Sequence, residues 1–221
     1  MNIKINILVF VLFILARTIT AQENNSNKTI SFIVPQYIIT NGIRVDIDVR
    51  KPDSKSWWVI SPYYYDDDSK HRILNPEDNS GFDPHRYESM YGVGLGIARK
   101  IFLRHGTKGF YAMAGVSYKY FNIRGDNEVY VEYREDDGLN YIEVQQLSYT
   151  VNINSYNGYA TIGYQINPFS KFYIDFYLGF GLRYSTHESP QNVITKYNRG
   201  NIDYGYSGTH PVVGGRLGIA L

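Results

Sequence analysis

Residues 172–184 read FYIDFYLGFGLRY and decide the fold class of this chain. Side chains on a β-strand point alternately to opposite faces of the sheet. One face of this segment is apolar or aromatic at every position: Phe172, Ile174, Phe176, Leu178, Phe180, Leu182 and Tyr184. The other face carries Tyr173, Asp175, Tyr177, Gly179, Gly181 and Arg183. Soluble sheets rarely expose such a stripe to water, whereas a transmembrane barrel strand has lipid outside and a polar lumen inside.

Similar strand patterns recur along the chain, separated alternately by short turns and long polar segments. We expect strands at residues 42–50, 57–65, 91–98, 110–120, 159–166 and 213–221, in addition to 172–184. The turns near residues 53, 106 and 169 are short, and the polar loops at about 66–89, 122–148 and 186–209 are long. Outer-membrane barrels place short turns in the periplasm and long loops outside. Within the second loop, residues 129–133 (VYVEY) could form a strand that protrudes beyond the membrane.

An even strand number requires one more strand before residue 42. Residues 30–39 are the candidate, joined to the next strand through Asn41-Gly42, a strong tight-hairpin signal. Pro35 argues against this strand, because proline removes one ladder hydrogen bond. The prediction is an all-β fold, a transmembrane antiparallel up-and-down β-barrel of eight strands with short periplasmic turns and long extracellular loops.

The first residues have the features of a secretory signal peptide. Lys4 precedes an apolar run at residues 7–16, and a small residue, Ala21, precedes a polar segment. The apolar run is too short to span a bilayer. We therefore expect a signal peptide at residues 1–21, a short polar segment at 22–28 and the barrel at 29–221. No cysteine follows the apolar run, which excludes a lipid-anchored lipoprotein.

The composition agrees with a closed barrel. The chain has no cysteine, so disulfides cannot hold an exported protein of this size together. A barrel leaves no unpaired strand edge. The 22 tyrosines suit the interfacial girdles of membrane barrels, and the 20 glycines suit a crowded lumen. The net charge of +1 gives no reason to expect binding to nucleic acid. The alternative is a secreted β-sandwich with tyrosine-rich strands.

Eight charged residues are predicted to face the lumen as a charged network: Arg44, Asp46, Asp48, Arg50, Lys119, Asp175, Arg183 and Arg216. A lumen of about eight strands is just wide enough to be filled by its own side chains. Charges in that space must pair, because an unpaired buried charge is very costly. The network would then plug the lumen. The alternative is a narrow ion path that weakly favours anions, since five of the residues are basic and three are acidic.

Other candidate motifs carry weaker signals, and we predict no catalytic residues, cofactor or metal. Residues 92–96 (GVGLG) are similar to a phosphate-binding loop, but their glycines alternate with apolar residues and no helix follows. We expect a tightly packed lumen face here, formed by Gly92, Gly94, Gly96 and Ala98. His210 with Ser207, or His187 with Ser185 and Glu188, could mimic a hydrolase site without a linking motif. The acidic groups at 66–68 and 136–137 could bind calcium or bridge to lipopolysaccharide through divalent ions, although solvated loops are the simpler interpretation. Residues 78–83 have oxygen ligands around a glycine but lack the spacing of a calcium loop and its closing glutamate.

The signal peptide, the alternating strands and a final strand that ends at Leu221 together resemble the eight-stranded outer-membrane β-barrel families, the porin-like or OmpA-type barrels. The hairpin at residues 43–65, with Asp48 and Arg50 before a short turn, is similar to their first clear hairpin. The resemblance implies location in the cell outer membrane and contact with outer-membrane lipid and lipopolysaccharide. It also implies a monomer assembled by the barrel-assembly machinery through the C-terminal strand.

Three functions remain open at this stage. The first is a structural or surface-interaction barrel with a filled lumen and exposed loops. The second is a small porin or ion channel, which would need a water-filled lumen. The third is an outer-membrane lipid-modifying enzyme, which would need a serine, a histidine and an acid within hydrogen-bond reach. The sequence favours the first function and does not identify a ligand.

Overall fold

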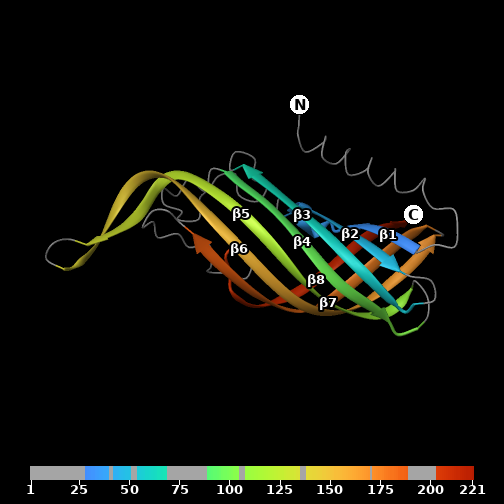
Figure 1. Cartoon of the computed structure of the whole chain (residues 1–221). Coiled ribbons are helices and arrows are strands. Elements are labelled where there is room, and N and C mark those ends of the chain that lie inside the picture. The colour runs from blue at the N-terminus through green and yellow to red at the C-terminus, as the bar shows by residue number, and fades with distance from the viewer. Residues whose placement is uncertain are drawn as a thin grey trace, which may run out of the picture.

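The computed structural model forms a closed antiparallel β-barrel in which eight strands follow one another in chain order (Figure 1). It describes residues 28–39, 42–50, 54–68, 89–104, 108–134, 138–169, 171–188 and 203–221. The strands are β1 (Lys28–Ile33), β2 (Gly42–Arg50), β3 (Ser56–Asp68), β4 (Ser89–Phe102), β5 (Gly109–Arg134), β6 (Asn140–Phe169), β7 (Phe172–Glu188) and β8 (Gly208–Ala220). The predicted all-β, up-and-down, eight-stranded barrel is confirmed. The predicted signal peptide and residues 22–27 lie outside the described residues.

The alternation of apolar and polar residues along 172–184 corresponds to the outer and inner faces of the barrel wall. On β7, the side chains of Phe180 and Leu182 are 75% and 66% exposed on the outer surface. Asp175 is fully buried, and Tyr177 is 4% exposed, on the inner surface. On β3, the two tryptophans divide in the same way, with Trp57 inside and Trp58 outside. The barrel therefore has an apolar outer surface and a mixed polar and aromatic interior.

The two ends of the barrel differ. We call the end that holds the short β2–β3, β4–β5 and β6–β7 connections the turn end; β1 begins and β8 finishes there. The opposite end is the loop end. Two of the predicted long loops lie mostly outside the described residues, at 69–88 and 189–202. None of the helices in the described ranges has the length and apolar character needed to cross a membrane.

The prediction of a polar loop at residues 122–148 is wrong for most of its length. β5 and β6 stay paired without interruption from Gly109↔Gln165 to Arg134↔Asn140, and their hairpin extends far beyond the other strands (Figure 1). The suggested protruding strand at residues 129–133 is part of it. Both faces of this extension are largely exposed, so its sequence lacks the apolar alternation that marks the barrel wall.

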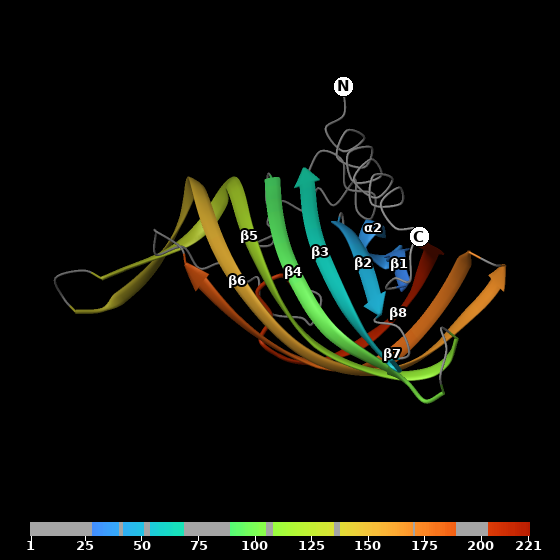
Figure 2. The same ribbon diagram turned by 45° about the vertical axis from the view of Figure 1, so that its right-hand side comes forward.

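The predicted first strand is also shorter than expected. β1 ends at Ile33, two residues before Pro35, and the chain then forms the short helix α2 (Gln36–Ile39) instead of a tight hairpin (Figure 2). Proline removes a ladder hydrogen bond, which favours ending the strand there. As a result, the ladder between β1 and β8 is short and joins Ile30–Ile33 to Leu217–Ala220.

Helix α2 packs against the part of β8 that β1 does not reach. The side-chain oxygen of Gln36 accepts a hydrogen bond from the backbone N–H of Gly215 at 3.3 Å. The amide nitrogen of Gln36 donates to the hydroxyl of Tyr177 at 2.7 Å, and it lies where a side chain at Gly214 would be. The first residues after β1 therefore help to line the lumen.

Aromatic side chains inside the barrel pack on glycines of neighbouring strands. The ring of Phe32 lies on Gly218 of β8, and the ring of Tyr111 lies on Gly163 of β6. The ring of Phe121 similarly covers Gly92, the first glycine of the GVGLG segment, which forms part of β4. Glycine is required at these positions because an added Cβ would overlap the ring.

We predict that Gly218→Ala destabilises the barrel by about 1–3 kcal/mol, the usual cost of overpacking a filled core. The added methyl group would displace Phe32. Gly215→Ala on the same strand is the matched control, because its Cβ would meet the nearest atom, on Phe176, at an ordinary 3.6 Å. The free energy of unfolding from urea titration of the refolded protein measures both. Equal losses in the two variants would contradict this packing.

Candidate functional site

Six buried charged side chains form an ion-pair core inside the barrel. The acids are Asp46 and Asp48 of β2 and Asp175 of β7, and each is at most 1% exposed. The bases are Arg44 of β2, Lys100 of β4 and Arg216 of β8. Strand register brings part of this set together, because Asp175 lies directly opposite Arg216. The core thus connects strands from around the whole barrel.

Each carboxylate of the core contacts at least one cation. Arg44 holds Asp46 with two bonds, from Nε to Oδ1 at 2.6 Å and from Nη2 to Oδ2 at 2.9 Å. Arg216 reaches all three acids: Nη1 lies 2.9 Å from Asp46 and 3.2 Å from Asp48, and Nη2 contacts Asp175. Lys100 lies 3.2 Å from Asp48 and 2.8 Å from Asp175. Arg216 is therefore the centre of the core.

Neutral residues complete the coordination of these charges. The hydroxyl of Tyr111 donates to Asp175, and Lys100 donates to the side-chain oxygen of Gln165, which lies opposite Asp175 on β6. The guanidinium carbon of Arg216 lies 4.4 Å from the centre of the Phe32 ring. Hydrogen bonds and ring contacts of this kind offset part of the cost of burying ions.

The ion-pair core has three acids and three bases, so its formal charges cancel. Removing a charge from water is costly, and mutual pairing with good geometry is what makes burial tolerable. A turn-end apolar cluster that includes Trp57, Phe102, Tyr111 and Tyr173 occupies the same half of the lumen. Ion pairs and aromatic rings therefore lie side by side in this half of the lumen.

The structure divides the eight residues predicted to form one network. Arg44, Asp46, Asp48, Asp175 and Arg216 belong to the ion-pair core. Arg50 instead stacks on Trp57 near the turn end, with its guanidinium carbon 5.3 Å from the ring centre. Lys119 and Arg183 line a separate cavity nearer the loop end.

Sequence reasoning missed Lys100, although a signal for it was present. The lumen face of β4 was assigned through Gly92, Gly94, Gly96 and Ala98, and the next residue in phase is Lys100. Its side chain is fully buried. With Lys100 the ion-pair core has three bases for its three acids, and the excess of bases inferred from the sequence lies outside the core, on Arg50, Lys119 and Arg183.

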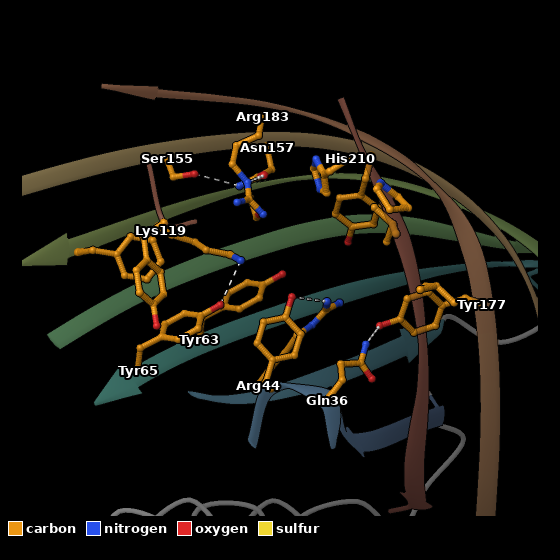
Figure 3. Close-up of a pocket in the computed structure, with 18 of the residues that line it drawn as sticks. Gln36, Arg44, Tyr63, Tyr65, Lys119, Ser155, Asn157, Tyr177, Arg183 and His210 are labelled. Atoms are coloured by element: carbon orange, nitrogen blue, oxygen red, sulfur yellow. Dashed lines mark hydrogen bonds between the residues drawn. The ribbon is translucent and has the colours of Figure 1, made fainter. Parts of the chain in front are cut away.

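A cavity of about 360 Å³ lies between the ion-pair core and the loop end (Figure 3). Its walls come from α2 and from strands β2, β3 and β5 to β8, with Tyr204 before β8. Six tyrosines line it: Tyr37, Tyr63, Tyr65, Tyr159, Tyr177 and Tyr204. Arg44 belongs both to the ion-pair core and to this lining, so the core borders the cavity.

The heads of Lys119 and Arg183 point into this cavity from different strands (Figure 3). Lys119 of β5 donates a hydrogen bond to the hydroxyl of Tyr65 at 3.1 Å. Arg183 of β7 donates to the side-chain oxygen of Asn157 at 2.9 Å and to the backbone carbonyl of Asp203 at 3.1 Å. No aspartate or glutamate is among the described residues that line the cavity, so its lining is cationic.

The weaker candidate sites do not assemble in the described ranges. Ser207 Oγ accepts a hydrogen bond from the backbone N–H of Ser185, and Ser185 Oγ contacts Ser155 Oγ and the carbonyl of Tyr206. These bonds join serines to serines and to the main chain, not to His187 or His210. No cluster of three or more metal-ligand side chains occurs among the described residues. Residues 78–83 and 136–137 lie outside them.

Comparisons with protein-family models, with curated proteins and with solved structures find no match to this chain.

We predict that Asp175→Leu and Lys100→Met each destabilise the barrel by about 3–5 kcal/mol, the usual cost of removing one partner from a buried ion pair. The double variant restores equal numbers of acids and bases. Its loss in free energy of unfolding should therefore be clearly smaller than the sum of the two single losses. A double-mutant cycle by urea unfolding measures the coupling. Lys171→Met, at an exposed position in the β6–β7 turn, is the control and should have little effect. Simple additivity would contradict a coupled core.

Proposed function

We propose that this chain is an outer-membrane β-barrel of the porin-like or OmpA type whose lumen is closed, and that it acts through its loop end at the cell surface. The observation that carries this proposal is the neutral ion-pair core across the lumen. A barrel of eight strands has room for its own side chains and little else, and here those side chains are charged, paired and packed with aromatic rings.

The outer surface supports placement in a bilayer. Large apolar side chains are more than half exposed on several neighbouring strands: Leu95, Phe110, Val116, Ile162, Leu178, Phe180, Leu182 and Val213. An apolar band of this extent around a closed barrel would be unfavourable in water and favourable in lipid. Together with the expected signal peptide at residues 1–21, it favours export and location in the outer membrane.

The asymmetry of the two ends suggests the orientation. Short connections at the turn end correspond to periplasmic turns, and the loop end with the long β5–β6 hairpin corresponds to the extracellular side. In this orientation the hairpin and the remaining loops contact lipopolysaccharide and external partners. The C-terminal strand β8 is the element that the assembly machinery would recognise, and the closed barrel has no need of a second subunit.

The rival functions make different demands on the lumen. A channel needs a continuous water-filled path, whereas the charges of the ion-pair core satisfy one another. A lipid-modifying enzyme needs a serine activated by a histidine, whereas the hydroxyls of Ser185 and Ser207 are engaged with serines and backbone. These features favour the closed surface barrel over both.

We predict that the refolded chain shows no steady conductance in planar bilayers, because the ion-pair core leaves no water path. Folding is checked first by a heat-dependent shift in gel mobility, so that silence reflects a closed barrel and not an unfolded one. Steady conductance that changes in Asp175→Asn or Arg183→Gln would overturn the closed-lumen proposal and establish an ion channel.

A further inference from the structure

The loop-end cavity contains a cation that no carboxylate neutralises in the described part of the chain. Lys119 is only 9% exposed, and none of the ion pairs among the described residues includes it. Its ammonium group hydrogen-bonds to the hydroxyls of Tyr65 and Tyr37 and lies 4.7 Å from the centre of the Tyr63 ring, which leaves one of its donors for a further acceptor. An ammonium group has three donors. A buried lysine held in this way can still donate to an acceptor that enters the cavity.

Among the described residues that line the cavity, the charged side chains beside Lys119 are arginines. Arg183 directs its guanidinium into the same space, and Arg44 lies at the boundary with the ion-pair core (Figure 3). Arg44 is already matched by Asp46, which holds it in two bonds. The field inside the cavity is therefore set by Lys119 and Arg183 and attracts an anion.

The uncharged residues of the cavity lining determine which kind of molecule could carry the bound anionic group. Six tyrosines and Phe121 form the largest group of lining residues, and hydroxyls, amides and the imidazole of His210 add neutral polar groups. Flat aromatic faces favour a planar ring through stacked or edge-to-face contacts. The volume of about 360 Å³ lies at the small end of the range for ligand pockets, which is about 300–1,000 Å³. The cavity thus suits a small molecule and not a polymer.

We infer that the loop-end cavity binds a small aromatic anion, with its carboxylate or phosphate group at Lys119 and Arg183 and its ring among the tyrosines. This inference goes beyond the proposed function, because a closed barrel could equally have a fully neutral interior. Lys119 is then retained for binding: a methionine of similar length would fill the same space without the cost of burying an uncompensated charge.

Isothermal titration of the refolded chain in a neutral detergent tests the inference, with phenyl phosphate and benzoate as probes. We expect saturable binding of at least one probe with one site per chain, and weaker binding of benzyl alcohol and of inorganic phosphate. Lys119→Met should weaken the affinity about tenfold or more, as expected for the loss of a charge-assisted hydrogen bond. Its urea unfolding midpoint should stay the same or rise.

Two further variants control for charge and for folding. Lys171→Met removes the same charge from an exposed turn and should keep the affinity, and Lys119→Arg should retain most of it. If Lys119→Met does not fold, the affinity of the unmodified chain is measured at rising NaCl concentration, and it should fall. Heat-dependent gel mobility confirms folding in each case.

Several results would overturn the inference. These are the absence of saturable binding to the unmodified chain, full affinity in folded Lys119→Met, or an affinity that salt does not change. Displacement of the probe by equimolar anionic phospholipid in the micelle would assign the site to a lipid headgroup instead of a soluble anion. Binding is measured in detergent without a conductance readout, so its failure is distinct from failure of the closed-lumen proposal.

Discussion

The structure depends on the pairing of three buried carboxylates with three buried cations inside a narrow barrel. Asp46, Asp48 and Asp175 would each be very costly to bury alone. Arg216 contacts all three, so a single side chain on the last strand links charges on β2 and β7. The closure of the barrel and the pairing of its charges therefore depend on each other: the strands bring the charges together, and the charges hold distant strands in register.

The same arrangement divides the lumen into two regions with different properties. On the turn-end side, the ion-pair core, whose formal charges cancel, lies beside a cluster of aromatic rings. On the loop-end side, a cavity lined by tyrosines retains the positive charges of Lys119 and Arg183. The contacts within the first region stabilise the barrel, and this is enough to explain why its residues are there. The second costs stability without an evident structural benefit, and for that reason it is the better place to look for a ligand.

Much of the fold could be predicted from the sequence because period-two alternation is a direct consequence of strand geometry. It predicted the inner and outer faces of β7 and, with the turn spacing, seven strands; the even strand number of such barrels added the eighth. It was less informative where both faces of a strand meet the same environment, as in the extended β5–β6 hairpin. It also left open how far β1 continues past Ile33, where the conformation of proline and the space beside β8 decide the outcome.

The site was only partly predictable. The alternation placed the charged residues inside, but it could not tell which of them pair, because pairing depends on the angular position of each strand around the barrel. Lys100 was overlooked although it is in phase with the glycines of β4, and its inclusion changes the charge balance of the core. The cavity could not be predicted at all, since its walls come from segments as distant in sequence as Gln36 and His210.

The most direct test of the account is the reactivity of single cysteines on either side of the proposed closure, which the natural absence of cysteine makes unambiguous. Ser117→Cys places a thiol in the loop-end cavity, and Ala98→Cys places one within the turn-end cluster. A small water-soluble methanethiosulfonate reagent added to the folded barrel should label the first rapidly and the second very slowly. Labelling of both positions at similar rates would show that water passes the ion-pair core and would contradict a closed lumen.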